Sequence, residues 1–172
     1  MGMDVYGKKA TAEVGEYFRR NVWGWRPLWQ YVNVCHPEIA GLVKYGHSND
    51  GDGLNARKSK LLANEIRENL VNGKAHAYIT ARALYLSELP KETCEHCEGT
   101  GIRTDAIGVE YGMPERELAP EIAIITGRTH GFCNGCSGEG TKDPWETNYS
   151  IEITDLEEFA NFLEHCGGFE IW

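Results

Sequence analysis

The chain has 172 residues, of which 41% are hydrophobic and 10% aromatic, and its 17 Lys and Arg against 26 Asp and Glu give a formal charge of −9. This composition excludes a disordered chain and indicates one domain, or one domain with a small inserted module. The negative charge disfavours nucleic-acid binding without a local basic patch, and it suits a partner with a basic surface, although an acidic balance by itself requires no partner.

The lack of a recognisable signal peptide or membrane-spanning run, together with the cysteine spacing, favours a cytoplasmic protein of a bacterial or host cell. No run of about 18 apolar residues occurs, so we expect no membrane-spanning helix. The first residues lack the apolar stretch of a signal peptide. Four of the six cysteines have the spacing of metal ligands, which fits a reducing compartment with thiolates on a metal better than disulfides.

Residues 1–34 are rich in aromatic side chains. Residues 11–20 indicate a short helix or turn with Thr11 as its N-cap. Pro27 then predicts the first turn of a helix that runs to about Cys35. Trp23 and Trp25 precede it and either grip a ligand or pack in the core. We favour the core, because basic residues are not interleaved with them, and retain both as members of a candidate interaction site.

Residues 46–55 form a polar loop that two interpretations fit. The spacing of its acidic residues fails to match a calcium-binding EF-hand, whose first, third and fifth positions carry oxygen ligands. One interpretation is a turn with an N-cap for the next helix. The other is a small-ligand or catalytic site that uses His47, Asn49, Asp50 and Asp52.

Two helices, at about 54–71 and 75–86, are expected to form an antiparallel hairpin around Asn72-Gly73. Apolar residues recur along the first helix at helical spacing and predict its buried face. These residues are Leu61, Leu62, Ile66, Leu70 and Val71. The densest basic cluster of the chain lies on the same helix and is either a solvated face or a nucleic-acid-binding face. Its residues are Arg57, Lys58, Lys60 and Arg67.

Residues 91–142 contain the most specific motif, C-x-x-C-x-G-x-G, which occurs at 94–101 and again at 133–140. In each copy two sulfurs of a tight turn point at one ion, and the glycines let backbone N–H groups turn toward the sulfurs. Two copies supply four thiolates, the ligands of a closed, tetrahedral, structural zinc site with no position for water. Iron and a redox-active dithiol are the alternatives. The predicted metal ligands are Cys94, Cys97, Cys133 and Cys136.

Other histidines and cysteines are expected to lie outside this ligand set. His96 and His130 are near the motifs, but four thiolates already complete the coordination, so we place them at the surface or behind the ligands. Cys35 and Cys166 have no partner at metal spacing and are interpreted as small apolar residues.

The two motifs resemble two of the four repeats in the cysteine-rich zinc finger of DnaJ-type co-chaperones. In that family, pairs of repeats close around one zinc ion, and the domain takes part in holding unfolded polypeptide; one pair here implies one zinc ion. The family's J-domain carries His-Pro-Asp, whereas this chain has His36-Pro37-Glu38 at an expected helix end. The resemblance therefore covers the module and does not imply chaperone activity. The rest of the chain resembles proteins encoded by bacteria and their phages.

The last 30 residues predict a strand, a helix and a second strand. Residues 149–154 alternate in polarity and indicate the first strand. Thr154 and Glu157 predict a capping box for a helix that ends near Cys166, and 169–172 form the final strand or tail. Between the two motifs at 94–101 and 133–140, which we call the first and second knuckles, residues 122–126 are compatible with a strand or a short helix.

These elements predict an α+β fold that is mainly helical. We expect a helical part at 1–90, a zinc-binding module at 91–142, and a strand-helix-strand at 143–172 that packs on the first part. The predicted function is binding rather than catalysis: a zinc-stabilised protein-interaction protein, phage-encoded, that acts on a host defence or regulatory complex. The alternatives are the small-ligand site or enzyme at 47–52 and nucleic-acid binding through the basic helix.

Overall fold

The computed structural model describes residues 2–172 and has the expected α+β fold, dominated by helices. The chain divides into two compact units. Unit 1 consists of the residues up to Ser87 together with Asn148–Trp172, and unit 2 is Glu88–Thr147. No helix within residues 2–172 combines the length and the apolar character needed to cross a membrane.

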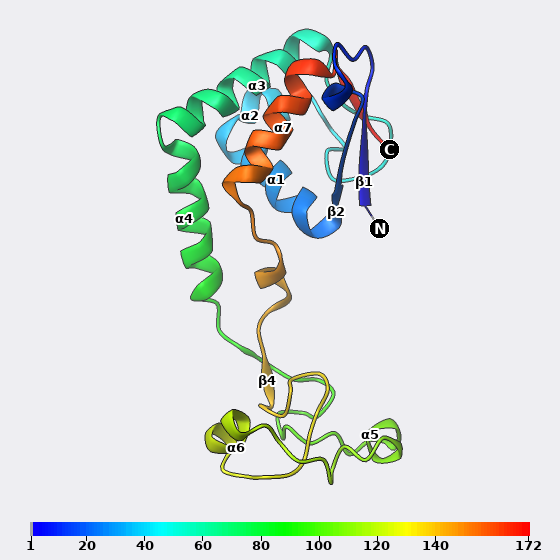
Figure 1. Cartoon of the computed structure of the whole chain (residues 1–172), viewed down its shortest axis with the longest axis vertical. Coiled ribbons are helices and arrows are strands. Elements are labelled where there is room, and N and C mark those ends of the chain that lie inside the picture. Colours follow the sequence, from blue (N-terminus) through cyan, green and yellow to red (C-terminus); the bar gives the residue numbers. More distant parts are fainter. Residues whose placement is uncertain (1) are drawn as a thin grey trace. The chain divides into compact units, whose positions relative to one another are not determined.

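The elements of unit 1 are coloured blue to green and orange to red in Figure 1. In chain order they are β1 (Gly2–Gly7), the 3-10 helix η1 (Glu13–Gly15), β2 (Tyr17–Asn21), α1 (Val22–Cys35), α2 (Pro37–Ala40), α3 (Ala56–Val71), α4 (Lys74–Ser87), α7 (Ile153–His165) and β5 (Phe169–Ile171). Another 3-10 helix, η2 (Trp145–Asn148), precedes α7 at the boundary between the units.

The sheet of unit 1 has three antiparallel strands in the order β2-β1-β5. Val5 of β1 pairs with Phe18 on one side and with Ile171 on the other. These three side chains are buried, whereas Tyr6 and Tyr17 lie on the opposite, solvent-facing surface of the sheet. The two ends of the chain thus build adjacent strands, and one face of the sheet closes the core.

Helix α1 supplies the centre of that core and begins five residues before the position that Pro27 predicts. Asn21 caps the helix by accepting a 2.9 Å hydrogen bond from the N–H of Gly24, so Pro27 lies inside the helix. The rings of Trp25 and Trp29 stack with centroids 5.6 Å apart. Burial of these rings outweighs the backbone hydrogen bond that proline cannot donate.

Helix α3 packs against α7, and their apolar faces complete the core of unit 1. The predicted stripe of α3 is only partly correct. Leu62 and Ile66 are fully buried, but Leu61 is exposed and Val71 is 90% exposed. Val71 is the last residue of its helix, where no neighbouring helix covers the side chain despite its apolar character.

One expected element of unit 1 is partly wrong and another is wrong. Residues 11–20 contain the short helix η1, but Ala12 rather than Thr11 precedes it and β2 follows it, and the N–H of Thr11 donates to the carbonyl of His165. Residues 149–152 form no strand, because the carbonyl of Tyr149 accepts two hydrogen bonds from Arg82. The following helix and β5 are present as expected.

The capping box of α7 lies two residues before its predicted position. The carboxylate of Glu152 caps the first turn, and the N–H of Glu152 donates to Asp155 in return. Thr154 is consequently inside the helix. Glu152 and Asp155 take the places of Ser/Thr and Glu in the usual S/T-x-x-E capping box. Their negative charges also interact favourably with the positive end of the helix dipole.

A buried polar network fixes the end of α1. His36 is 6% exposed, and its Nδ1 lies 2.8 Å from Oε2 of Glu65. Asn69 donates to the hydroxyl of Tyr31 at 3.1 Å and lies 3.3 Å from Nε2 of His36. A neutral imidazole that donates from Nδ1 and accepts at Nε2 satisfies these contacts. Burial lowers the pKa of His36, and this effect outweighs the opposing contact with Glu65.

The network predicts that acid destabilises unit 1. Because the pKa of His36 is lower in the folded chain than the ordinary value of about 6.5 in the unfolded chain, the unfolded chain binds the proton first. The free energy of unfolding should therefore fall as pH drops below about 6.5, by at most about 1.4 kcal/mol per pH unit. His36→Gln should reduce this slope in urea titrations followed by tryptophan fluorescence, and the remainder should come from His47, whose pKa is also lowered by burial. The exposed His76 provides the control: His76→Gln with the same reduced slope would contradict the assignment.

Candidate metal centre

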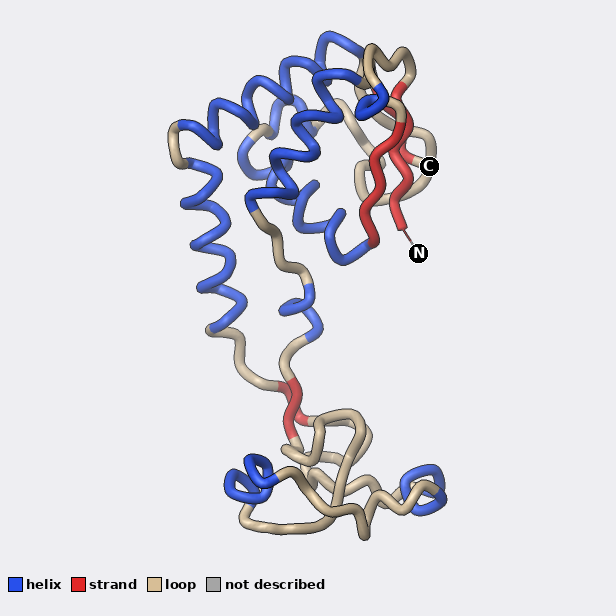
Figure 2. The backbone as a smooth tube through the Cα atoms, in the orientation of Figure 1, coloured by secondary structure: helices blue, strands red, loops and turns tan. Residues whose placement is uncertain are grey.

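Unit 2 is built mostly from loops, with short helices and one small ladder (Figure 2). Its elements are β3 (Glu92–Thr93), α5 (Ala106–Glu110), α6 (Pro120–Thr126) and β4 (Thr141–Lys142). Strands β3 and β4 pair antiparallel, and the N–H of Cys94 continues the pairing by donating to the carbonyl of Gly140. This ladder brings the start of the first knuckle to the end of the second.

The four cysteine thiols of the knuckles converge, and their Sγ atoms all lie within 4.8 Å of one another. Cys94 and Cys133 are fully buried, and their sulfurs are 3.8 Å apart. The sulfurs of Cys97 and Cys136 are 3.7 Å apart. Sulfurs bound at about 2.3 Å around a tetrahedral zinc ion would be separated by about 3.8 Å. The cluster therefore has the dimensions of a closed metal site.

Each knuckle directs one backbone N–H at a sulfur. The N–H of Gly101 donates to Sγ of Cys97, and the N–H of Gly140 donates to Sγ of Cys136, both at 3.2 Å. The two bonds occupy the same place in the repeated motif, as the sequence predicts. Donors of this kind stabilise negative charge on sulfur and so favour the thiolate form that binds metal.

The ionisation of the four thiols is interdependent. Burial raises the pKa of Cys133 to about 12 and also raises the pKa of Cys136. Burial opposes ionisation of Cys97 as well, but the Gly101 N–H and the neighbouring thiols hold the pKa of Cys97 below its usual range. Crowded thiolates repel one another, so full ionisation of the cluster requires a cation among them.

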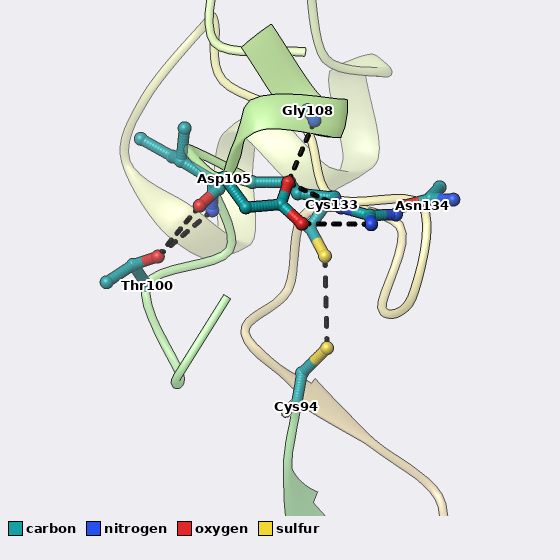
Figure 3. A network of polar contacts seen from close by, with 8 residues as sticks. Cys94, Thr100, Asp105, Gly108, Cys133 and Asn134 are labelled. Carbon is teal, nitrogen blue, oxygen red and sulfur yellow. Dashed lines mark hydrogen bonds and ion pairs between the residues drawn. The ribbon is translucent and has the colours of Figure 1, made fainter. Parts of the chain in front are cut away.

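Arg103, which follows the first knuckle, joins Asp105 to Asn134 of the second knuckle, and Figure 3 shows both partners near Cys133. The Nε and Nη2 of Arg103 donate to the two carboxylate oxygens of Asp105 at 2.9 and 3.0 Å, and its Nη1 donates to Asn134 at 2.9 Å. Asp105 also caps α5 by accepting from the N–H of Gly108. Asp105 raises the pKa of Arg103, and the nearby sulfur groups of Cys133 and Cys94 add to the effect. The guanidinium of Arg103 therefore lies near the sulfurs, held in place by Asp105 and Asn134.

Arg103→Gln should weaken metal retention without unfolding the module. The variant removes the positive charge that faces the thiolates and breaks the tie to Asn134, so we expect zinc affinity to fall about tenfold, the lower range for partners behind metal ligands. Competition with a chromogenic zinc chelator measures the change. Lys60→Gln is the matched control, because it removes the same charge from an exposed residue of α3 in unit 1. An equal loss in both variants would show that only net charge matters.

The predicted metal ligands come together, and the histidines near them stay outside the cluster. His96 is exposed and lies against Gly135, and His130 is exposed with its Nδ1 3.0 Å from the hydroxyl of Thr129. Cys35 and Cys166 belong to unit 1. The sequence analysis missed Arg103 as a supporting residue, although its place two residues after a motif glycine was a usable signal.

The polar loop at 46–55 directs its side chains to different partners. Asp50 accepts a hydrogen bond from the hydroxyl of Ser48, and Asn49 donates to the carbonyl of Gly2 at 3.1 Å. His47 lines a cavity of about 300 Å³ with Trp29 and Asn33, to which Asn49, Asp50 and Asp52 do not contribute.

Asp52 holds the loop together. Partial burial opposes its ionisation, but the N–H groups of Tyr45, Gly53 and Lys44 hold the pKa of Asp52 below its usual range. The helix cap is Asn55, which accepts from the N–H of Lys58 at 3.0 Å. These contacts account for the loop as a turn that leads into α3, and a ligand site at 47–52 stays a prediction.

The remaining candidate residues are distributed over unit 1. Trp25 is fully buried and donates from Nε1 to the carbonyl of Gly46 at 2.7 Å, whereas Trp23 packs against the ring of Tyr149 with centroids 5.1 Å apart. Trp23 and Trp25 are therefore not on one shared surface.

The basic residues of α3 divide between two sites. Arg57, Lys58 and Lys60 line an open cavity of about 400 Å³. Arg67 instead contacts α7, where it pairs with Glu164 and donates to Asn161. Nucleic-acid binding through all four residues stays a prediction, and the pairing of Arg67 removes part of the charge that it requires.

Comparison of the chain with protein-family models, with curated proteins and with solved structures found no match.

Proposed function

We propose that this chain is a zinc-stabilised protein-interaction protein, in which the four knuckle cysteines hold one structural zinc ion. The observation that carries the proposal is the convergence of four buried thiols within 4.8 Å of one another, two pairs of them at 3.7 and 3.8 Å, with one backbone N–H directed at a sulfur in each knuckle. Four protein ligands leave no open position, so the role of the metal is to fold unit 2 rather than to activate water.

Zinc supplies what the composition of unit 2 lacks. Apart from the cysteines, Leu118 is the one large apolar side chain of Glu88–Thr147 that is fully enclosed. A 60-residue segment with so small a core requires another source of folding free energy. Structural zinc contributes about 10–16 kcal/mol in small zinc modules, which is enough to order such loops.

The resemblance to the DnaJ-type cysteine-rich zinc finger supports the same assignment. The resemblance is carried by the cysteines and glycines of the two motifs at 94–101 and 133–140, and we propose that one pair of knuckles closes around one ion as a pair does in that family. A protein-binding role fits because a metal with four protein ligands cannot bind water or substrate, whereas the module that it orders presents a rigid surface to a partner. The rest of the chain resembles proteins encoded by bacteria and their phages. We therefore propose a host defence or regulatory complex in the cytoplasm as the target.

Metal removal from the intact protein tests the proposal. The zinc-replete chain should contain one zinc ion, measured by native mass spectrometry, and about four thiols should become reactive only after chelation. Hydrogen exchange should rise across 88–147 on chelation and change little in unit 1. A chain that binds no zinc, or that keeps unit 2 protected without it, would refute the structural role.

A further inference from the structure

Most of the negative charge of the chain belongs to unit 2. Residues 88–147 contain twelve Asp and Glu against five Lys and Arg, a formal charge of −7 out of −9 for the whole chain. Unit 1 is therefore almost balanced, at −2. Four thiolates on one divalent ion would add two further negative charges to unit 2. The electric field of this protein therefore directs a positively charged partner to unit 2.

Helix α6 places large apolar side chains at the surface of this acidic unit. Ile124 is 83% exposed and Ile125 is 71% exposed. Glu121 is also exposed and lies three and four residues before them, so it shares their face of the helix. Adjacent isoleucines at this exposure leave apolar surface in water, which is typical of an interaction site. We call Glu121, Ile124 and Ile125 the α6 surface.

The remaining residues of this region fix the direction in which the α6 surface points. Leu118 is buried against Gly138 of the second knuckle, and Ile122 approaches the same glycine. The N–H of Leu118 donates to the carbonyl of Thr129 at 2.9 Å, which ties the start of the helix to the chain that follows it. The helix is thus anchored through Ile122 to the second knuckle, whereas Ile124 and Ile125 face outward.

The charge of unit 2 selects among the occupants that could cover this surface. A second copy would bring two units of −7 together, and nucleic acid or an anionic lipid surface would be repelled as well. A basic polypeptide is attracted. Its apolar side chains would remove Ile124 and Ile125 from water, and a neighbouring cation would pair with Glu121.

We propose that the α6 surface binds a polypeptide segment in which Lys or Arg alternates with large apolar residues. This inference rests on the proposed function and locates its interaction site. Burial of two isoleucines should provide affinity, while the acidic field should provide rapid association and selection against acidic segments. The second knuckle acts as the support for the surface, because Leu118 and Ile122 hold α6 against Gly138.

Binding of defined peptides to the full, zinc-loaded chain tests the inference. The probe is a fluorescein-labelled 15-residue peptide of alternating Arg and Leu, and fluorescence anisotropy near physiological salt measures its affinity. We expect binding at least tenfold tighter than that of the peptide with Ser in place of Leu, or of the peptide with Glu in place of Arg. Equal binding of the Arg–Ser peptide would reduce the effect to charge alone and overturn the proposal.

Variants locate the binding surface. The double variant Ile124→Ser, Ile125→Ser should lower affinity for the Arg–Leu peptide at least tenfold while keeping one zinc per chain, and Glu121→Lys should lower it too. Val71→Ser is the matched control, because Val71 is a similarly exposed aliphatic residue in unit 1. This variant should bind the Arg–Leu peptide with the same affinity as the unmodified chain. Unchanged binding in the double variant, or dimerisation that this variant abolishes, would overturn the proposal.

The outcomes for the α6 surface and for the metal are separable. If the chain holds zinc as proposed but binds the peptide independently of the isoleucines, the docking surface is wrong and the structural zinc stands. If the isoleucines control binding in a chain that holds no zinc, the docking surface stands and the zinc assignment fails.

Discussion

Cys94→Ser is expected to abolish zinc binding and to unfold unit 2 while unit 1 stays folded. Cys94 is fully buried, and its sulfur lies 3.8 Å from that of Cys133. A serine hydroxyl is a poor replacement for a thiolate in a closed four-sulfur site, so most of the roughly 10–16 kcal/mol that zinc contributes to such modules should be lost. Unit 1 has its own core, and its packed tryptophans should keep their native fluorescence.

The control for Cys94→Ser is Cys35→Ser. Cys35 is half-buried at the end of α1 and lies in unit 1, so its replacement should leave the zinc content at one ion per chain. Metal content and hydrogen exchange measured on both variants decide the result. Retention of zinc by Cys94→Ser would show that the ion is held elsewhere.

Gly140→Ala should destabilise the knuckle pair by several kcal/mol, the second largest effect that we expect. Gly140 has a φ of +87°, where a non-glycine residue costs about 1–2 kcal/mol. A Cβ at this position would lie 2.3 Å from the carbonyl oxygen of Gly99 in the other knuckle. Because that contact is with backbone, the two knuckles must separate, which would also displace the N–H that Gly140 donates to Cys136.

Gly112→Ala isolates the contribution of backbone strain. Gly112 lies in the same unit with a φ of +62°, and no atom lies within 4 Å of the position of its added Cβ. This variant should keep its zinc affinity, whereas Gly140→Ala should lose it by at least a hundredfold in chelator competition. Similar zinc affinities in the two variants would mean that the knuckles do not approach as closely as described.

The cluster of four cysteines could be predicted from the sequence because the information is local. Each knuckle is an eight-residue motif whose turn geometry places sulfur and N–H together, and only the pairing of the two copies depends on the fold. The ends of α3 were predictable for the same reason, since Asn55 and the Asn72-Gly73 pair act on the adjacent backbone.

Features that depend on distant contacts were not predictable. Helix α1 starts at Val22 because burial of Trp25 and Trp29 compensates for Pro27, and residues 149–152 leave the predicted strand because Arg82 binds the carbonyl of Tyr149. Strand β1 is paired by β2 and by β5, which follows more than 160 residues later. Periodicity also could not show that α6 is a helix with Ile124 and Ile125 in water, because its contact with the second knuckle, through Ile122, sets which side is buried.

X-ray absorption spectroscopy of the zinc-loaded chain tests the central claim most directly, since it reports the number and kind of ligands around the metal. We predict four sulfur ligands at about 2.3 Å and no nitrogen or oxygen in the first coordination sphere. A shell that contains oxygen or nitrogen, or fewer than four sulfurs, would contradict a closed site formed by Cys94, Cys97, Cys133 and Cys136.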